Sequence, residues 1–261
     1  QCHATRPRLV AVGRMSRHLA AWLALFTTLL CGSAHAGRVV NLASTDYPPY
    51  FSPQLPGDGV VAAITRAALA KHGHTLKLHY RPWARLIAEV KTGQFDGVMA
   101  VWYEPARAEY LHYSQPLVNT VMGFYGRVDK PLATLPLSAL RTQVIGTVRG
   151  YKNPDVFEQA GLKQELAADD LTNLRKLAAG RLDLVLIDKV LAQHLRSHLS
   201  PQERQAIRWQ DPPLEVMPLH VGLRRELGDG EQLLADFNDG LQTLRKNGQL
   251  AALIRQYQLA Q

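Results

Sequence analysis

The chain has 261 residues, of which 46% are hydrophobic and 20% charged, a composition that excludes wholesale disorder and collagen-like repeats. Its formal net charge of +8 at pH 7 would be compatible with nucleic-acid binding. However, lysine and arginine are scattered along the chain, and many lie beside acidic residues, as in Glu203-Arg204. The sequence lacks a clustered basic surface, so we expect no nucleic-acid partner.

Residues 15–36 have the three-part pattern of a secretory signal peptide. Arg17 and His18 form a basic start, residues 19–30 a mostly apolar run, and Ala34-His35-Ala36 an A-x-A cleavage site. A helix over that apolar run would be about 18 Å long, too short for a hydrocarbon core of roughly 30 Å. We therefore predict that residues 1–36 are an N-terminal extension and signal peptide, and that the rest is exported to the periplasm.

Removing this leader changes the charge and the cysteine content. Its four arginines and lack of acidic residues leave residues 37–261 with a net charge of +4, which is unremarkable. Both cysteines, Cys2 and Cys31, lie in the leader. The exported part therefore cannot contain a disulfide, a cysteine nucleophile or a thiolate metal site.

The exported part alternates predicted strands and helices. In chain order we expect a strand at 38–44, a helix at 60–72, a strand at 75–80, a helix from Pro82 to Gly93 and a strand at 95–102. A second series follows, with a strand at 143–148, helices at 153–160 and 169–179, a strand at 182–187 and a helix at 189–198. An extended segment at 220–223 and one or two helices over 231–259, broken near Asn247-Gly248, complete the chain. This alternation predicts an α/β fold.

The α/β elements form two series, and residues 127–138 between them are rich in proline and polar residues. This stretch resembles a domain boundary, so the pattern favours two lobes over one large sheet.

The sequence lacks the common catalytic motifs. The sequence contains no G-x-S-x-G, GxGxxG, Walker loop or HExxH motif. His194 and His198 stand four residues apart and could share a zinc ion, but no third ligand accompanies them, and two surface histidines on a helix explain them as well. We expect no catalytic residue, no metal and no cofactor.

Four residues near the ends of predicted elements could bind a ligand: Tyr47, Trp83, Arg107 and Asp188. In open α/β sheets, ligands bind beyond the carboxyl ends of the strands. The Arg107 guanidinium could hold a carboxylate and the Asp188 carboxylate an ammonium group, so together they could clamp a zwitterion. The alternatives are that Arg107 pairs with a nearby glutamate, Glu104 or Glu109, and that Asp188 caps the helix that follows it.

The sequence also resembles a known family. The resemblance rests on residues 45–50 (TDYPPY), 83–97 (WARLIAEVKTGQFDG), 104–116 (EPARAEYLHYSQP), 179–188 (AGRLDLVLID) and 247–250 (NGQL), in this order. These segments are similar to the amino-acid-binding periplasmic proteins of ABC importers, solute-binding protein family 3.

The resemblance implies a periplasmic binding protein fold with two lobes and two crossover hinge strands. Lobe 1 would comprise residues 37–124 and 222–261, lobe 2 residues 129–217, and the hinges residues 125–128 and 218–221. A small amino acid or related carboxylate would bind between the lobes, which close on it. An ABC permease of the inner membrane would be the partner, and the protein would act as a monomer.

The resemblance also implies roles for individual residues. Tyr47 and Trp83 would be aromatic walls, Arg107 would grip the α-carboxylate, Asp188 would accept from the α-amino group, and backbone amides near Gly150 would add donors.

The chain departs from the family pattern at three places. Glu104 and Tyr151 stand where the family commonly has threonine or serine, and the segment around Val101 and Trp102 lacks the usual serines. Because Trp102 and Tyr151 would fill space in the site, they favour a smaller, aromatic or altogether different ligand.

Three functions are compatible with the sequence. The first is a solute-binding protein of an ABC transporter. The second is an enzyme on the same scaffold, a dehydratase of cyclic carboxylic acids with Glu104 as its general acid. The third is a ligand sensor that acts on a separate membrane protein.

Overall fold

The structure is a computed structural model that describes residues 37–257. The predicted signal peptide and both cysteines lie outside the described residues. Within residues 37–257, no helix is long and apolar enough to span a membrane.

The first half of the fold is built on a largely parallel group of strands. β1 (Val39–Ser44) lies between β2 (Thr75–Tyr80) and β3 (Gly97–Trp102) and is parallel to both. The short β4 (Leu111–Tyr113) joins through β9 (Ile207–Arg224), which is antiparallel to β3 and β4. The helices of this half are η1 (Pro56–Asp58), α2 (Val60–Ala70), α3 (Trp83–Lys91), α4 (Pro105–Ala108), α9 (Gly230–Lys246) and α10 (Gln249–Gln256).

The second half repeats this arrangement with its own strands. β6 (Ile145–Val148) lies between β7 (Gln164–Ala167) and β8 (Leu184–Asp188) and is parallel to both. Its helices are η2 (Leu137–Leu140), α5 (Asp155–Gln159), α6 (Asp170–Ala178), α7 (Lys189–Leu195), η3 (Arg196–His198) and α8 (Pro201–Ala206).

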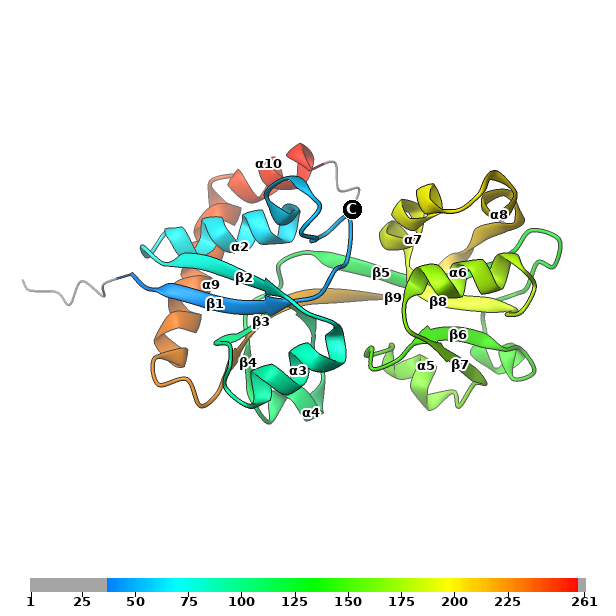
Figure 1. The fold of residues 1–261 in the computed structure, drawn as a ribbon, viewed down its shortest axis with the longest axis horizontal. Helices are drawn as coiled ribbons and strands as arrows, with labels where there is room; N and C mark the ends of the chain where they lie inside the picture. The colour runs from blue at the N-terminus through cyan, green and yellow to red at the C-terminus, as the bar shows by residue number, and fades with distance from the viewer. Residues whose placement is uncertain (1–36, 258–261) are drawn as a thin grey trace, which may run out of the picture. The chain divides into compact units, whose positions relative to one another are not determined.

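Two long strands, β5 (Asn119–Arg127) and β9, connect the halves (Figure 1). β9 pairs with β3 and β4 through its last residues and with β5 through the remainder, while β5 also pairs with β8. The resulting strand order is β2-β1-β3-β9-β5-β8-β6-β7. Each half therefore keeps its own parallel strands, and only β5 and β9 belong to both.

β3 and β8, one strand from each half, are apolar along most of their length. All residues of β3 and of β8 are buried, as expected for strands that are covered on both faces. In the first half, α2 packs closely against α9, so closely that a Cβ atom at Gly240 would lie 2.1 Å from the Ala68 carbonyl oxygen.

Most predicted elements are confirmed. The strand at 75–80 has the predicted bounds, and the predicted interruption of the helix near Asn247-Gly248 separates α9 from α10. The predictions missed β4, β5, β7 and α8, and they limited β9 to residues 220–223. β9 runs through Pro212 and Pro213 because neither proline has a partner on β5. The register shifts from Met122 opposite Glu215 to Phe124 opposite Gln210, so no hydrogen bond between the strands requires an N–H group from either proline.

Candidate functional site

A small cavity lies at the carboxyl ends of β1 and β3. Its volume is about 30 Å³, enough for one or two water molecules. The residues that line it are Thr45, Tyr47, Phe51, Trp83, Ala100, Val101, Trp102, Tyr151, Lys152 and Leu219. Tyr151 and Lys152 come from the second half and most of the others from the first half, so side chains of both halves meet here.

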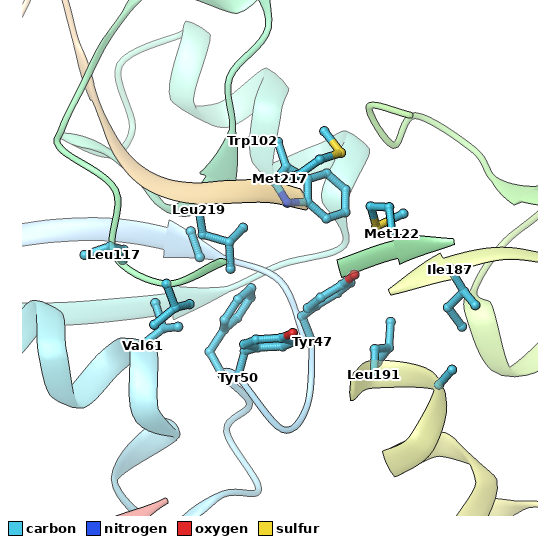
Figure 2. Packing of buried hydrophobic residues seen from close by; sticks show 14 of the residues in the cluster. Tyr47, Tyr50, Val61, Trp102, Leu117, Met122, Ile187, Leu191, Met217 and Leu219 are labelled. Atoms are coloured by element: carbon cyan, nitrogen blue, oxygen red, sulfur yellow. The ribbon is translucent and has the colours of Figure 1, made fainter. Parts of the chain in front are cut away.

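The loop after β1 supplies one wall. The Tyr47 amide donates to the Phe51 carbonyl at 2.9 Å, which folds the loop back on itself, and the Tyr47 ring stacks on Phe51 at 5.6 Å and on Tyr50 at 5.9 Å. Figure 2 shows Tyr47 and Tyr50 on this loop, on the side where Met122 of β5 and Leu191 of α7 lie. Burial, followed by the charges of Asp188 and Asp170, raises the pKa of Tyr47 well above its usual range.

An irregularity in β3 supplies the second wall. The register of β3 against β9 shifts between Val98 and Val101, and Ala100 adopts a φ of 66°. A bulge of this kind changes the direction in which the following side chains point. Here Val101 and Trp102 line the cavity, and the Trp102 indole donates to the Thr120 hydroxyl at 3.0 Å.

Tyr151 stands among the aromatic side chains of the first half. Its ring lies 6.1 Å from Trp102, 6.3 Å from Tyr47 and 6.4 Å from Trp83, in edge-on or tilted orientations. Beside it, the Trp83 indole donates to the Gly150 carbonyl at 2.8 Å. Gly150 has a φ of 80°, a conformation that favours glycine and lets the turn after β6 approach Trp83.

Arg107 is buried in α4 and is engaged by groups of its own half. Its Nε lies 2.9 Å from a Glu104 carboxylate oxygen, and its guanidinium lies 5.0 Å from the centre of the Trp83 ring. Arg107 does not line the cavity. The pairing with Glu104, which the sequence analysis left open as an alternative, is therefore present.

Asp188 is fully buried and accepts hydrogen bonds on both carboxylate oxygens. The Tyr50 hydroxyl donates to it at 3.1 Å, the Val121 amide at 2.8 Å and the Leu191 amide at 2.7 Å. The last bond caps α7, the other role that the sequence left open. Burial raises the pKa of Asp188, although the hydrogen bonds of Leu191 and Val121 oppose this rise.

Asp170, at the start of α6, is a charged residue near the site that the sequence analysis did not single out. Burial raises its pKa from 3.8 to about 7, and the charges of Asp169 and Asp188 contribute to the rise. Burial, the Asp170 and Asp169 charges and a hydrogen bond to Asp170 also raise the pKa of Tyr151. The sequence offers no signal for this, because Asp170 follows an ordinary N-cap, Asp169, and only the fold buries it.

Five of the eight predicted ligand-binding residues line the cavity: Tyr47, Trp83, Val101, Trp102 and Tyr151. Gly150 accepts a hydrogen bond from Trp83, which lines the cavity. Arg107 pairs with Glu104 and Asp188 accepts from Tyr50, and neither lines the cavity. Sequence reasoning missed Thr45, Tyr50, Phe51, Ala100, Lys152 and Leu219, although Thr45 and Tyr50 lie in the TDYPPY segment that it quoted. Among residues 37–257, no three His, Asp or Glu side chains are grouped as a metal site.

The sequence profile of bacterial extracellular solute-binding proteins, family 3, matches residues 40–260. No curated protein matches the chain.

Solved structures resemble the fold. A histidine kinase sensor domain with similarity to periplasmic binding proteins is 22% identical, with a TM-score of 0.73, over 85% of this chain and 96% of that one. A mutant of ArgBP from T. maritima is 18% identical, with a TM-score of 0.69, over 84% and 94% of the two chains. The ancestral amino acid-binding protein AncCDT-1, a precursor of cyclohexadienyl dehydratase, is 19% identical, with a TM-score of 0.68, over 84% and 95%. These likenesses confirm the predicted two-lobed α/β fold.

Proposed function

We propose that this chain, which belongs to the bacterial extracellular solute-binding proteins of family 3, captures a small amino acid or a related carboxylate or zwitterion in the periplasm and delivers it to an ABC permease of the inner membrane. The solute binds between lobe 1, residues 37–124 and 222–261, and lobe 2, residues 129–217. The hinge at 125–128 comprises the last residues of β5 and Val128, and the hinge at 218–221 lies within β9; both halves share these two strands.

The observation that carries this proposal is the aromatic cavity to which both halves contribute. Tyr47, Trp83 and Trp102 of the first half surround Tyr151 of the second half. A cavity of about 30 Å³ is far smaller than an ordinary ligand site of roughly 300–1,000 Å³. Entry of a solute therefore requires Tyr151 to move away from the other rings, which a hinge motion between the lobes accomplishes. Ligand binding then favours the arrangement in which both lobes contact the solute.

A thermal-shift screen of the protein against amino acids, carboxylates and amines tests the proposal. A ligand present at a hundredfold excess over its Kd stabilises the folded state by about 2.7 kcal/mol, which is readily seen as a rise in Tm. Trp83→Ala is expected to abolish the shift, and Tyr103→Ala, at a side chain that is 53% exposed and outside the cavity, to preserve it. A screen in which no small solute raises the Tm would refute the proposal.

A second candidate is an enzyme on this scaffold, and Asp170 is the observation that favours it. A buried carboxyl whose pKa is about 7 has the property of a general acid at neutral pH. Glu104, which the sequence suggested for this role, is paired with Arg107 instead. Loss of absorbance from a cyclic dienyl acid, absent in Asp170→Asn, would support the enzyme. If the protein does not turn over the compound, the enzyme is excluded and the solute-binding function remains.

A further inference from the structure

The two charged groups expected to hold a zwitterion are already satisfied by the protein. The carboxylate of Glu104 lies 2.9 Å from Arg107, and Asp188 accepts from Tyr50 and from two backbone amides. A ligand carboxylate would have to displace Glu104, and a ligand ammonium would have to displace the Tyr50 hydroxyl. Recognition by this pair alone is therefore weak in the arrangement observed.

The cavity itself offers few hydrogen-bond acceptors. Its polar side chains are Thr45, Lys152 and the hydroxyl-bearing Tyr47 and Tyr151, and Lys152 is a donor that pairs with Asp155. A primary ammonium or a guanidinium has several N–H donors, and a cavity with this few acceptors would replace only part of the hydrogen bonds that the donors lose from water, which is costly. A quaternary ammonium group has no N–H and does not incur this loss.

What the cavity does offer is aromatic surface on several sides. Tyr47, Trp102 and Tyr151 lie at centroid distances of 6.0–6.3 Å from one another with interplanar angles of 60–89°, and Trp83 lies edge-on to Tyr151. Rings that face one point from different directions attract a cation through their π electrons.

The charges near these rings have the complementary sign. Asp170 and Asp188 are buried, and neither takes part in the ion pairs found among residues 37–257. Lys152, which lines the cavity, pairs with Asp155, and Arg107, which lies beside Trp83, pairs with Glu104. Burial raises the pKa of both carboxyls. A positively charged ligand beside them would favour their ionised forms and pair with the negative charge.

We propose that the cavity formed by Tyr47, Trp83, Trp102 and Tyr151 binds a small organic cation whose charge lies on a quaternary, N-methylated ammonium group. This inference rests on the proposed function, because it names the class of solute that the same site takes. The head group is larger than the cavity of about 30 Å³, so Tyr151 withdraws to admit it and then closes over it.

Isothermal titration calorimetry of the full chain with two matched pairs of compounds tests the proposal. Choline is compared with 3,3-dimethylbutan-1-ol, its neutral isostere, and trimethylglycine with glycine. The first pair isolates the charge and the second the methyl groups. We expect the quaternary member of each pair to bind at least tenfold more tightly.

Variants at Tyr151 connect the preference to the rings. Tyr151→Leu, which keeps apolar volume but removes the ring, is expected to weaken binding of the quaternary compounds at least tenfold, and Tyr151→Phe to weaken it less. Trp209→Leu is the control, because Trp209 lies under Lys189 at 5.2 Å, outside the cavity. If Tyr151→Phe and Tyr151→Leu lose the same affinity for the quaternary compounds, the aromatic ring does not contribute to binding and the inference is overturned.

The outcomes separate this inference from the proposed function. Equal binding within either pair overturns the inference. Preferential binding of glycine or arginine overturns it too, while leaving the amino-acid-binding function in place. If none of these compounds and none of the standard amino acids binds, both proposals fail.

Discussion

Replacing Asp170 with asparagine is expected to stabilise the protein increasingly as the pH rises from 4 to 8. In the folded protein the pKa of Asp170 is about 7, against an ordinary value of 3.8. Between these two values the folded chain holds one proton more than the unfolded chain, so the free energy of unfolding falls by about 1.4 kcal/mol per pH unit. Above pH 7 the accumulated cost is about 4 kcal/mol. Asparagine keeps the shape of the side chain and cannot ionise.

Urea denaturation followed by circular dichroism at half-unit intervals from pH 4 to pH 8.5 measures this effect. The quantity of interest is the difference in the free energy of unfolding between Asp170→Asn and the unsubstituted protein, because other titrating groups cancel in it. The difference should grow with pH and level off above pH 7. Asp169→Asn keeps a good N-cap and removes a repelling charge, so the levelling should occur at lower pH in that background. A difference that does not change with pH would refute the reasoning.

Three further predictions concern packing, a buried hydrogen bond and the candidate site. Gly240→Ala should destabilise the protein by about 2 kcal/mol in urea denaturation, because the added Cβ would lie 2.1 Å from a backbone oxygen of α2; helix propensity alone predicts the opposite sign. Tyr50→Phe should cost about 2 kcal/mol, because the buried Asp188 carboxylate loses a donor. Glu104→Gln should free Arg107 and strengthen the binding of carboxylate-bearing solutes about tenfold, as measured by calorimetry.

Each of these predictions has a control within the chain. A Cβ at Gly228 meets no atom within 4 Å, so Gly228→Ala should be nearly neutral. Tyr103→Phe, at an exposed ring, is the control for Tyr50→Phe, and Glu109→Gln, at an exposed carboxylate, is the control for Glu104→Gln. Neither control should have the effect of the substitution that it is matched with. A Gly240→Ala variant as stable as the parent, an unchanged Tyr50→Phe, or unaltered carboxylate affinity in Glu104→Gln would contradict the respective argument.

The sequence by itself determined those elements whose signal is local. The alternation in residues 75–80 gave β2, the apolar run before Trp102 gave β3, and the break at Asn247-Gly248 separated the last two helices. It also identified most of the aromatic residues of the cavity, because Tyr47 and Trp83 lie in short segments with recognisable neighbours.

Only the tertiary structure decided how β5 and β9 connect the halves and which partners the charged residues take. β5 pairs with residues some 90 positions later in the chain, so its own pattern does not reveal it. In the same way, Asp188 accepts from Tyr50, which lies far away in the sequence. The burial that raises the pKa of Asp170 also depends on distant segments. Periodicity is a property of neighbouring residues, whereas desolvation and hydrogen-bond competition arise when distant segments exclude water together.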